Sequence, residues 1–179
     1  MGFRDSIAIL TLYKTGIRIR TLGELRERHI DFDNRTLNLD GQILKNHDYL
    51  KLPIDEELAE SLKALIAQNK KIRAHCGTRN EYVFITQTGR GINNSNSNTN
   101  AISKQLSKYA DRYDLNNINA HAIRRTFAKN LLNRGATDLI LLVINLVFNF
   151  SPIRFKRILL FLFGVFWYFG LVYSYCSLL

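Results

Sequence analysis

The sequence predicts a mostly helical α+β domain with a small β-sheet or hairpin, followed by a hydrophobic C-terminal helix. Several segments carry apolar residues at the spacing of amphipathic helices, whereas residues 35–54 alternate apolar and polar positions as a β-hairpin does. Composition also changes at about residue 139. All 15 acidic residues and 22 of the 25 Lys and Arg lie in residues 1–138, which leaves that part with a charge of +7.

The first elements are a helix, a turn and the hairpin. Residues 5–13 are predicted to form a short helix that stops at Gly16, because glycine readily adopts the positive φ of a helix end. Arg18 then begins a helix or a turn. Lys45 lies at the tip of the hairpin, in a polar Lys-Asn-His-Asp break. Four apolar residues around Arg18 can face a core: Ile17, Ile19, Leu22 and Leu25.

Three helices, a strand and a polar loop follow. Asp55 is placed to cap an amphipathic helix that extends to about Gln68, since aspartate is a favoured residue before the first helical turn. Residues 82–86 are predicted to form a short strand, and residues 91–100 a polar loop. The last helix begins near His121 and ends at Gly135. The helix between the polar loop and this last helix is predicted to have an apolar face of Ile102, Leu106, Tyr109 and Tyr113.

The C-terminal segment, residues 139–179, has a different composition. It holds three charged residues, all basic, and 11 of the 20 aromatic residues. Residues 158–179 are uncharged over 22 positions, which matches the length that a helix needs to cross a bilayer. Hydropathy therefore predicts a membrane-spanning helix, with the basic residues 154–157 on the cytoplasmic side. A buried core helix is disfavoured, because the small first part is unable to cover so long an apolar run.

Composition narrows the classes of function. A net charge of +10 and a pI near 9.8 indicate an anionic partner, either nucleic acid or an acidic membrane surface. Cys76 and Cys176 have neither CxxC spacing nor a histidine cluster, so no disulfide framework or zinc site is predicted. The N-terminal apolar run is too short for a signal peptide. We expect a cytoplasmic chain, with membrane anchoring through residues 158–179 as the alternative.

Four residues have side chains suited to phosphate chemistry: Arg18, Lys45, His121 and Arg124. Singly, each is ordinary: an arginine after a turn is usually a solvated charge, and a hairpin lysine commonly protects a sheet edge. Together, "TGIR", the hairpin lysine eight residues before Pro53, and "HAIRRTFAKNLLNRG" resemble the catalytic domain of the tyrosine recombinases, the phage integrase family.

The resemblance covers roughly residues 4–141 and implies a recombinase-like fold. Two positions depart from the family pattern. Thr21 stands where an acidic residue commonly follows the first arginine, and Arg125 stands where a second histidine is usual.

The resemblance implies integration or site-specific recombination of DNA through a 3′-phosphotyrosyl intermediate. Arg18 and Arg124 would clamp the phosphate, since each guanidinium is permanently charged and offers a planar fork of donors. Lys45 would be the general acid for the leaving 5′-oxygen, and His121 would support proton transfer. DNA binding is expected at Arg18, Lys45, Arg124 and Arg125, on a homo-oligomer assembled on DNA. The implied reaction needs no metal and no cofactor.

The nucleophilic tyrosine is not identified. Family members continue with a Leu-Gly-His segment and then the tyrosine, but here no histidine follows His121 and the first tyrosine after Arg124 is Tyr168. Tyr168 and the two later tyrosines lie inside the hydrophobic run. We therefore expect an incomplete active site that binds phosphate without forming the protein–DNA ester. The alternative is a membrane-anchored DNA-binding remnant without catalysis.

A change of reading frame near residues 139–142 would remove the acidic residues, the histidine and the tyrosine together. Met1 also lies only a few residues ahead of the region that resembles the family. We therefore expect a fragment, with residues 1–138 as a partial catalytic domain and residues 139–179 as a frameshifted or membrane-spanning tail.

Overall fold

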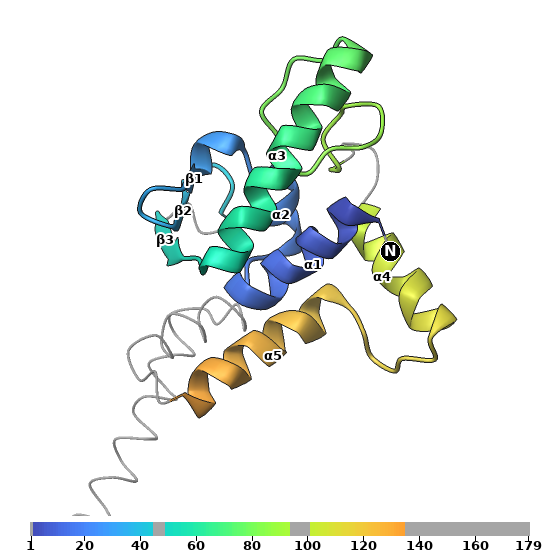
Figure 1. Ribbon diagram of the computed structural model, residues 1–179. Helices are drawn as coiled ribbons and strands as arrows, with labels where there is room; N and C mark the ends of the chain where they lie inside the picture. The colour runs from blue at the N-terminus through green and yellow to red at the C-terminus, as the bar shows by residue number, and fades with distance from the viewer. Residues whose placement is uncertain (1, 45–48, 94–100, 135–179) are drawn as a thin grey trace, which may run out of the picture. The chain divides into compact units, whose positions relative to one another are not determined.

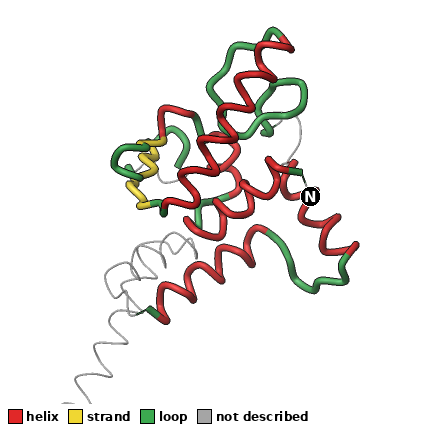
Figure 2. Tube along the Cα trace, in the orientation of Figure 1, coloured by secondary structure: helices red, strands yellow, loops and turns green. Residues whose placement is uncertain are grey.

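The computed structural model describes residues 2–44, 49–93 and 101–134 (Figure 1). Within these ranges the chain is mostly helical with one small antiparallel sheet, which confirms the predicted α+β class (Figure 2). The predicted C-terminal helix and the boundary at residue 139 lie outside the described residues. The elements are α1 (Phe3–Thr15), α2 (Ile19–Glu24), the 3-10 helix η1 (Glu27–His29), β1 (Ile30–Asp31), β2 (Thr36–Leu39), β3 (Leu50–Pro53), α3 (Glu56–Cys76), α4 (Ala101–Arg112) and α5 (Ala120–Asn133).

The long helices begin and end at residues suited to the purpose. Gly16 follows α1 with a φ of 62°, and its N–H donates to the carbonyl of Leu12. Asp55 caps α3, because its carboxylate accepts the N–H of Leu58 at 3.0 Å. Gly77 ends α3 with a φ of 65°. At the ends of α1 and α3 the residue with a positive φ is glycine, which has no Cβ to clash there.

Helix α3 is longer than the sequence predicts, since it extends to Cys76 rather than to about Gln68. The reason is Asn69, a polar residue that is buried on the core-facing side and donates to the carbonyl of Val83 at 2.7 Å. A polar residue at a buried position breaks the apolar periodicity from which the helix was predicted.

The sheet confirms the predicted hairpin and adds a strand. β2 pairs antiparallel with β3, and the two-residue strand β1 pairs with β2 on its other edge. Alternate residues of β2 and β3 are buried, and those between them face solvent. The buried face consists of Leu37, Leu39, Leu50 and Leu52. The hairpin therefore has one core face and one solvent face.

The predicted strand at residues 82–86 is wrong as a strand. Only isolated bridges form there, between Arg26 and Tyr82 and between Ile85 and Gly91. Val83, Phe84 and Ile85 are all buried, so both sides of this segment face the core instead of alternating. Its backbone also bonds different segments in turn, including the carbonyl of Leu25. The run of apolar residues correctly indicates that this segment is buried, but the segment does not pair with a neighbour as a β-strand does.

The core lies where α1 packs against α3 and α5 (Figure 1). Ile17, Leu22 and Leu25 are buried as predicted, whereas Ile19 is half-buried. The predicted apolar face of α4 is confirmed for Ile102 and Leu106, which are buried. Tyr109 is half-buried.

The placement of Tyr113 on that face is wrong, because this side chain is 61% exposed. Helix α4 ends at Arg112, so Tyr113 no longer follows the helical period. No helix in the described ranges is long and apolar enough to cross a membrane. The predicted span at residues 158–179 lies outside those ranges.

Candidate functional site

The structure brings together two of the predicted site residues, Arg18 and Arg124. Arg18 precedes the first turn of α2, and Arg124 lies in the second turn of α5. Burial, and to a lesser extent the positive charge of the nearby Arg18, together lower the pKa of Arg124 to about 10. Arg124 is only 4% exposed. Burial also lowers the pKa of Arg18. Two like charges are thus held near enough to each other to interact.

The meeting of these two arginines depends on contact between Gly16 and Phe127. A Cβ on Gly16 would lie 2.2 Å from Cδ1 of Phe127, so only glycine permits this approach. Gly16 lies two residues before Arg18, and Phe127 lies one helical turn after Arg124. The contact therefore sets the distance between the segments that carry the two guanidiniums. Each partner lies inside a predicted motif, but the sequence alone did not indicate that they touch.

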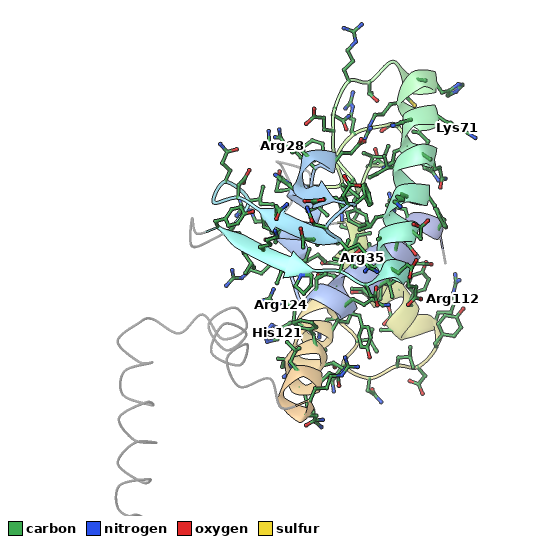
Figure 3. The ribbon with its side chains drawn as sticks, turned by 60° about the vertical axis from the view of Figure 1, so that its left-hand side comes forward. Arg28, Arg35, Lys71, Arg112, His121 and Arg124 are labelled. Atoms are coloured by element: carbon green, nitrogen blue, oxygen red, sulfur yellow. The ribbon has the colours of Figure 1, made fainter. Side chains whose placement is uncertain are left out.

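Helix α5 presents His121 and Arg124 one turn apart at its beginning (Figure 3). Asn119 caps this helix, since its side-chain oxygen accepts the N–H of Ala122 at 2.9 Å. His121 and Arg125 are exposed, in contrast to the buried Arg124. The predicted His-x-x-Arg geometry is therefore present, with the histidine open to solvent. Arg125 faces away from the buried position that Arg124 occupies.

Lys45 lies outside the described residues, so its position relative to the two arginines stays a prediction. The arm of the hairpin that leads to it is described as far as Leu44. The hydroxyl of Thr21 donates to the carbonyl of Ile43 at 3.2 Å, and Thr21 is 2% exposed. This bond ties the hairpin arm to α2, three residues after Arg18. The sequence identified Thr21 only as a departure from the family pattern, whereas the structure gives it a contact.

His29 ties the same arm to η1 from the other side. It is buried, and its Nδ1 accepts the N–H of Arg26 at 3.1 Å while its Nε2 lies 3.3 Å from the carboxylate of Asp40. Burial lowers the pKa of His29, although Asp40 opposes that change. A neutral ring with the proton on Nε2 satisfies both contacts. Asp40 in turn accepts the N–H of Gln42, at the turn that leads toward Ile43.

A third contact holds the far end of α2. The amide of Asn93 donates to the carbonyl of Arg20 at 3.1 Å and to the carboxylate of Glu24 at 2.8 Å. Gly23 makes room for it, because a Cβ there would lie 2.1 Å from Oδ1 of Asn93. The short helix that starts with Arg18 is therefore fixed along its length by polar contacts from other segments.

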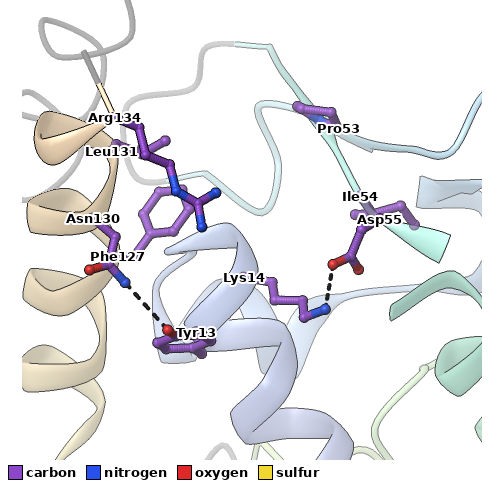
Figure 4. A pocket seen from close by; sticks show the side chains of 9 residues that line it. All are labelled: Tyr13, Lys14, Pro53, Ile54, Asp55, Phe127, Asn130, Leu131 and Arg134. Carbon is purple, nitrogen blue, oxygen red and sulfur yellow. Dashed lines mark hydrogen bonds and ion pairs between the residues drawn. The ribbon is translucent and has the colours of Figure 1, made fainter. Parts of the chain in front are cut away.

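A pocket of about 490 Å³ lies apart from the two arginines (Figure 4). Within it Lys14 contacts the carboxylate of Asp55, and Lys14 also contacts that of Glu57. Asn130 donates to the hydroxyl of Tyr13 at 3.3 Å. Neither Arg18 nor Arg124 lines it. The residues that do are Tyr13, Lys14, Pro53, Ile54, Asp55, Phe127, Asn130, Leu131 and Arg134.

No cluster of three or more His, Cys, Asp or Glu within the described ranges is arranged to hold a metal ion. The described site is therefore built from cations and one imidazole.

The sequence profile described as "Phage integrase family" matches residues 1–142. The chain belongs to the phage integrase family. The recombinase resemblance carried by the three motifs is thereby confirmed, and with it the family of DNA breaking and rejoining proteins to which the fold corresponds.

Curated relatives of this integrase-family chain include transposases and recombinases. The transposase from transposon Tn916 of Enterococcus faecalis is 29% identical over 144 residues, which cover 71% of this chain and 35% of the relative. The tyrosine recombinase XerC of Oceanobacillus iheyensis is 30% identical over 138 residues, covering 76% of this chain and 43% of the relative. The chain thus spans less than half the length of either protein.

Solved recombinase structures share the fold. The XerA recombinase superposes with a TM-score of 0.64 at 16% identity, covering 87% of this chain and 52% of that one. The XerH site-specific recombinase, solved bound to its difH substrate, gives a TM-score of 0.62 at 19% identity, covering 87% of this chain and 42% of that one. The integrase of transposon Tn1549, in complex with transposon right-end DNA, gives a TM-score of 0.56 at 19% identity. The match covers 87% of this chain and 58% of that one.

Proposed function

We propose that this chain is the partial catalytic domain of a DNA breaking-rejoining recombinase, and that its arginine pair holds a backbone phosphate of DNA. The pairing of Arg18 with the buried Arg124 carries the proposal. The charges of these two guanidiniums act on each other, and a phosphodiester supplies a negative charge with several acceptor oxygens that suits such a pair.

The roles of the other residues follow from this phosphate. His121, exposed one turn before Arg124, is proposed to exchange a proton with a group bound at the arginine pair. Lys45 is proposed as the general acid for the leaving 5′-oxygen, because the hairpin arm that leads to it is bonded to the helix of Arg18. Arg125, exposed on α5, is proposed to contact DNA backbone outside the reaction centre.

We infer that the chain binds DNA without forming a covalent link to it. After Arg124 the next tyrosine is Tyr168, in the hydrophobic segment. A phosphate clamp without a nucleophile polarises the phosphorus but leaves the phosphodiester intact. Homologues solved on DNA support DNA as the partner, and assembly of several copies on one DNA is part of the same proposal.

Incubation of the full chain with labelled duplex and nicked suicide substrates tests the function. We expect salt-sensitive binding in a gel shift and no adduct after denaturation. Arg18→Ala and Arg124→Ala are expected to weaken binding, whereas Lys63→Ala, on the exposed side of α3, serves as the matched control. A covalent adduct would show that a late tyrosine is a nucleophile. Loss of all DNA binding by the unaltered chain at low salt would overturn the proposed function.

A second proposal concerns the C-terminal segment. We propose that residues 158–179 anchor the chain to a membrane while residues 1–138 face the cytoplasm. The 22 uncharged positions support it. Cell fractionation tests it, since recovery of the full chain in the soluble fraction would exclude an anchor. Translation of the coding DNA after codon 138 in the other frames tests the frameshift instead. A Gly-His segment and a following tyrosine there would support that origin.

A further inference from the structure

The solvent face of the β2–β3 hairpin presents an aromatic side chain in a fixed orientation. Tyr49 is 65% exposed, more than any other large hydrophobic side chain in the described residues. Single exposed aromatics are common on protein surfaces and need no function. Tyr49 differs because its hydroxyl donates to Oδ1 of Asn38 on the neighbouring strand at 3.0 Å. The bond holds the ring against the sheet by one end and leaves its surface open.

Tyr49 is flanked by polar groups that suit nucleic acid. Asn38 and Lys51 lie directly opposite each other in the β2–β3 register, and Lys51 is exposed. Residues 49 and 51 share one face, because side chains two apart on a strand point the same way. The surface therefore combines an aromatic ring, an amide and a cation. We call Asn38, Tyr49 and Lys51 the hairpin face.

Two carboxylates near the hairpin face have partners of their own, and the charge of one of them, Asp31, also interacts with that of Lys51. Asp31 accepts both the backbone N–H and the side-chain amide of Asn34, at 2.9 and 2.7 Å. Asp40 contacts Arg28 and His29. Lys51 is an exposed cation of β3, two residues after the aromatic ring, and Asp31 is the acidic group whose charge acts on it.

The hairpin face belongs to the same structural unit as the arginine pair. The hydroxyl of Thr21 bonds the carbonyl of Ile43, so the arm that continues β2 is attached to the helix that Arg18 begins. A DNA strand whose phosphate lies between Arg18 and Arg124 would therefore pass near the hairpin.

We propose that Tyr49 packs its ring against a sugar or base of the DNA strand that the arginine pair binds, with Lys51 on a neighbouring phosphate. This inference rests on the proposed function and adds a contact that does not depend on charge. A ring that packs on a sugar or base neutralises no phosphate, so this contact releases no counterions and depends little on salt. A lysine on a phosphate instead releases counterions, so its contribution falls as salt rises.

The test measures binding of the full chain to a labelled duplex, by fluorescence anisotropy over a range of salt. Tyr49→Leu is expected to weaken binding about tenfold, within the range seen when aromatic partners of bases are removed. Tyr49→Phe keeps the ring and is expected to retain most of the affinity. Neither change should alter the slope of log K against log salt, whereas Lys51→Gln should lower its magnitude by about 0.9.

Tyr113→Leu is the matched control, because Tyr113 is 61% exposed but lies after α4, away from the hairpin. Circular dichroism spectra check that each variant is folded. Unchanged affinity for Tyr49→Leu, or an equal loss for Tyr113→Leu, would overturn the inference. Failure of the proposed function is a separate result, because the unaltered chain itself would then show no binding that depends on Arg18 and Arg124.

Discussion

At the scale of single residues, the arginine pair works against the stability of the free protein. The pKa of Arg124 is lowered to about 10 in the folded chain, well below the ordinary value of an arginine. Folding therefore disfavours the protonated form, and this penalty is fully present at neutral pH. It diminishes only as pH rises through about 10. A bound anion compensates the same charge, so ligand binding and folding should be linked.

The first prediction follows from that linkage. Phosphate or sulfate should raise the Tm of the full chain relative to chloride at equal ionic strength. At about 100 times the Kd, the expected gain in unfolding free energy is about 2.7 kcal/mol. Arg18→Gln and Arg124→Gln should lose most of this gain, and Arg112→Gln, on α4, should retain it. Equal stabilisation of all variants in a thermal melt would assign the effect to general salt action instead.

The second prediction concerns Gly16. Gly16→Ala should cost more than about 2 kcal/mol of unfolding free energy, because the residue has a positive φ and the new Cβ would overlap Phe127. Gly77 has a similar φ of 65° but nothing within 4 Å of the added Cβ. Gly77→Ala should therefore cost only about 1 kcal/mol. Urea unfolding curves measure both, and similar losses would contradict the close contact with α5.

Gly16→Ala should also weaken anion binding, since it separates the segments that bear Arg18 and Arg124. Gly77→Ala should leave anion binding unchanged. The phosphate-dependent rise in Tm measures this second effect independently of the loss in stability.

At the scale of elements, the sequence predicts those parts whose periodicity is regular. The alternating residues of the hairpin and the capped start of α3 at Asp55 are both present in the structure. Prediction fails where a residue serves a tertiary contact instead of a local pattern. Asn69 is a polar residue buried within α3, where it bonds the carbonyl of Val83, so the apolar period stops before the helix does. The apolar run beginning at Tyr82 crosses the core without forming a strand.

The candidate site shows the same division. The motifs predict that Arg18 and Arg124 belong to one site, and the structure brings their charges near enough to interact although they lie more than a hundred positions apart. The contacts that hold them there were not predictable, because nothing local to Thr21 or Gly16 identifies Ile43 or Phe127 as a partner. Buried hydroxyls and glycines acquire their roles only when distant segments meet.

The third prediction tests how α2 holds the hairpin. Thr21→Val keeps the side-chain shape but removes the donor to Ile43, at a cost of about 1 kcal/mol. Amide hydrogen exchange should accelerate in β2 and β3 and stay slow in α1. Thr11→Val is the matched control, because the buried hydroxyl of Thr11 bonds Ile7 within its own helix. Unchanged exchange in the hairpin would show that this bond does not anchor the arm.

At the scale of the whole molecule, charge is distributed unevenly around a fold of moderate size. The net charge of +10 favours any polyanion, so affinity alone says little about where DNA lies. Single cations at different places on the fold can distinguish DNA binding at the arginine pair from general attraction of a polyanion. Figure 3 shows His121 and Arg124 together at the beginning of α5, whereas Lys71 on α3 lies at the opposite end of the view.

The fourth prediction uses this separation. Arg125 is exposed beside Arg124, so Arg125→Gln should reduce the magnitude of the slope of log K against log salt by about 0.9 for duplex DNA. The same change should leave phosphate-induced stabilisation intact, because that depends on the buried arginine. Lys71→Gln should leave the slope unchanged if DNA binds at the arginine pair. Equal reductions for Arg125 and Lys71 would instead mean that DNA binds over the whole basic surface, and the site would then contribute no orientation to the complex.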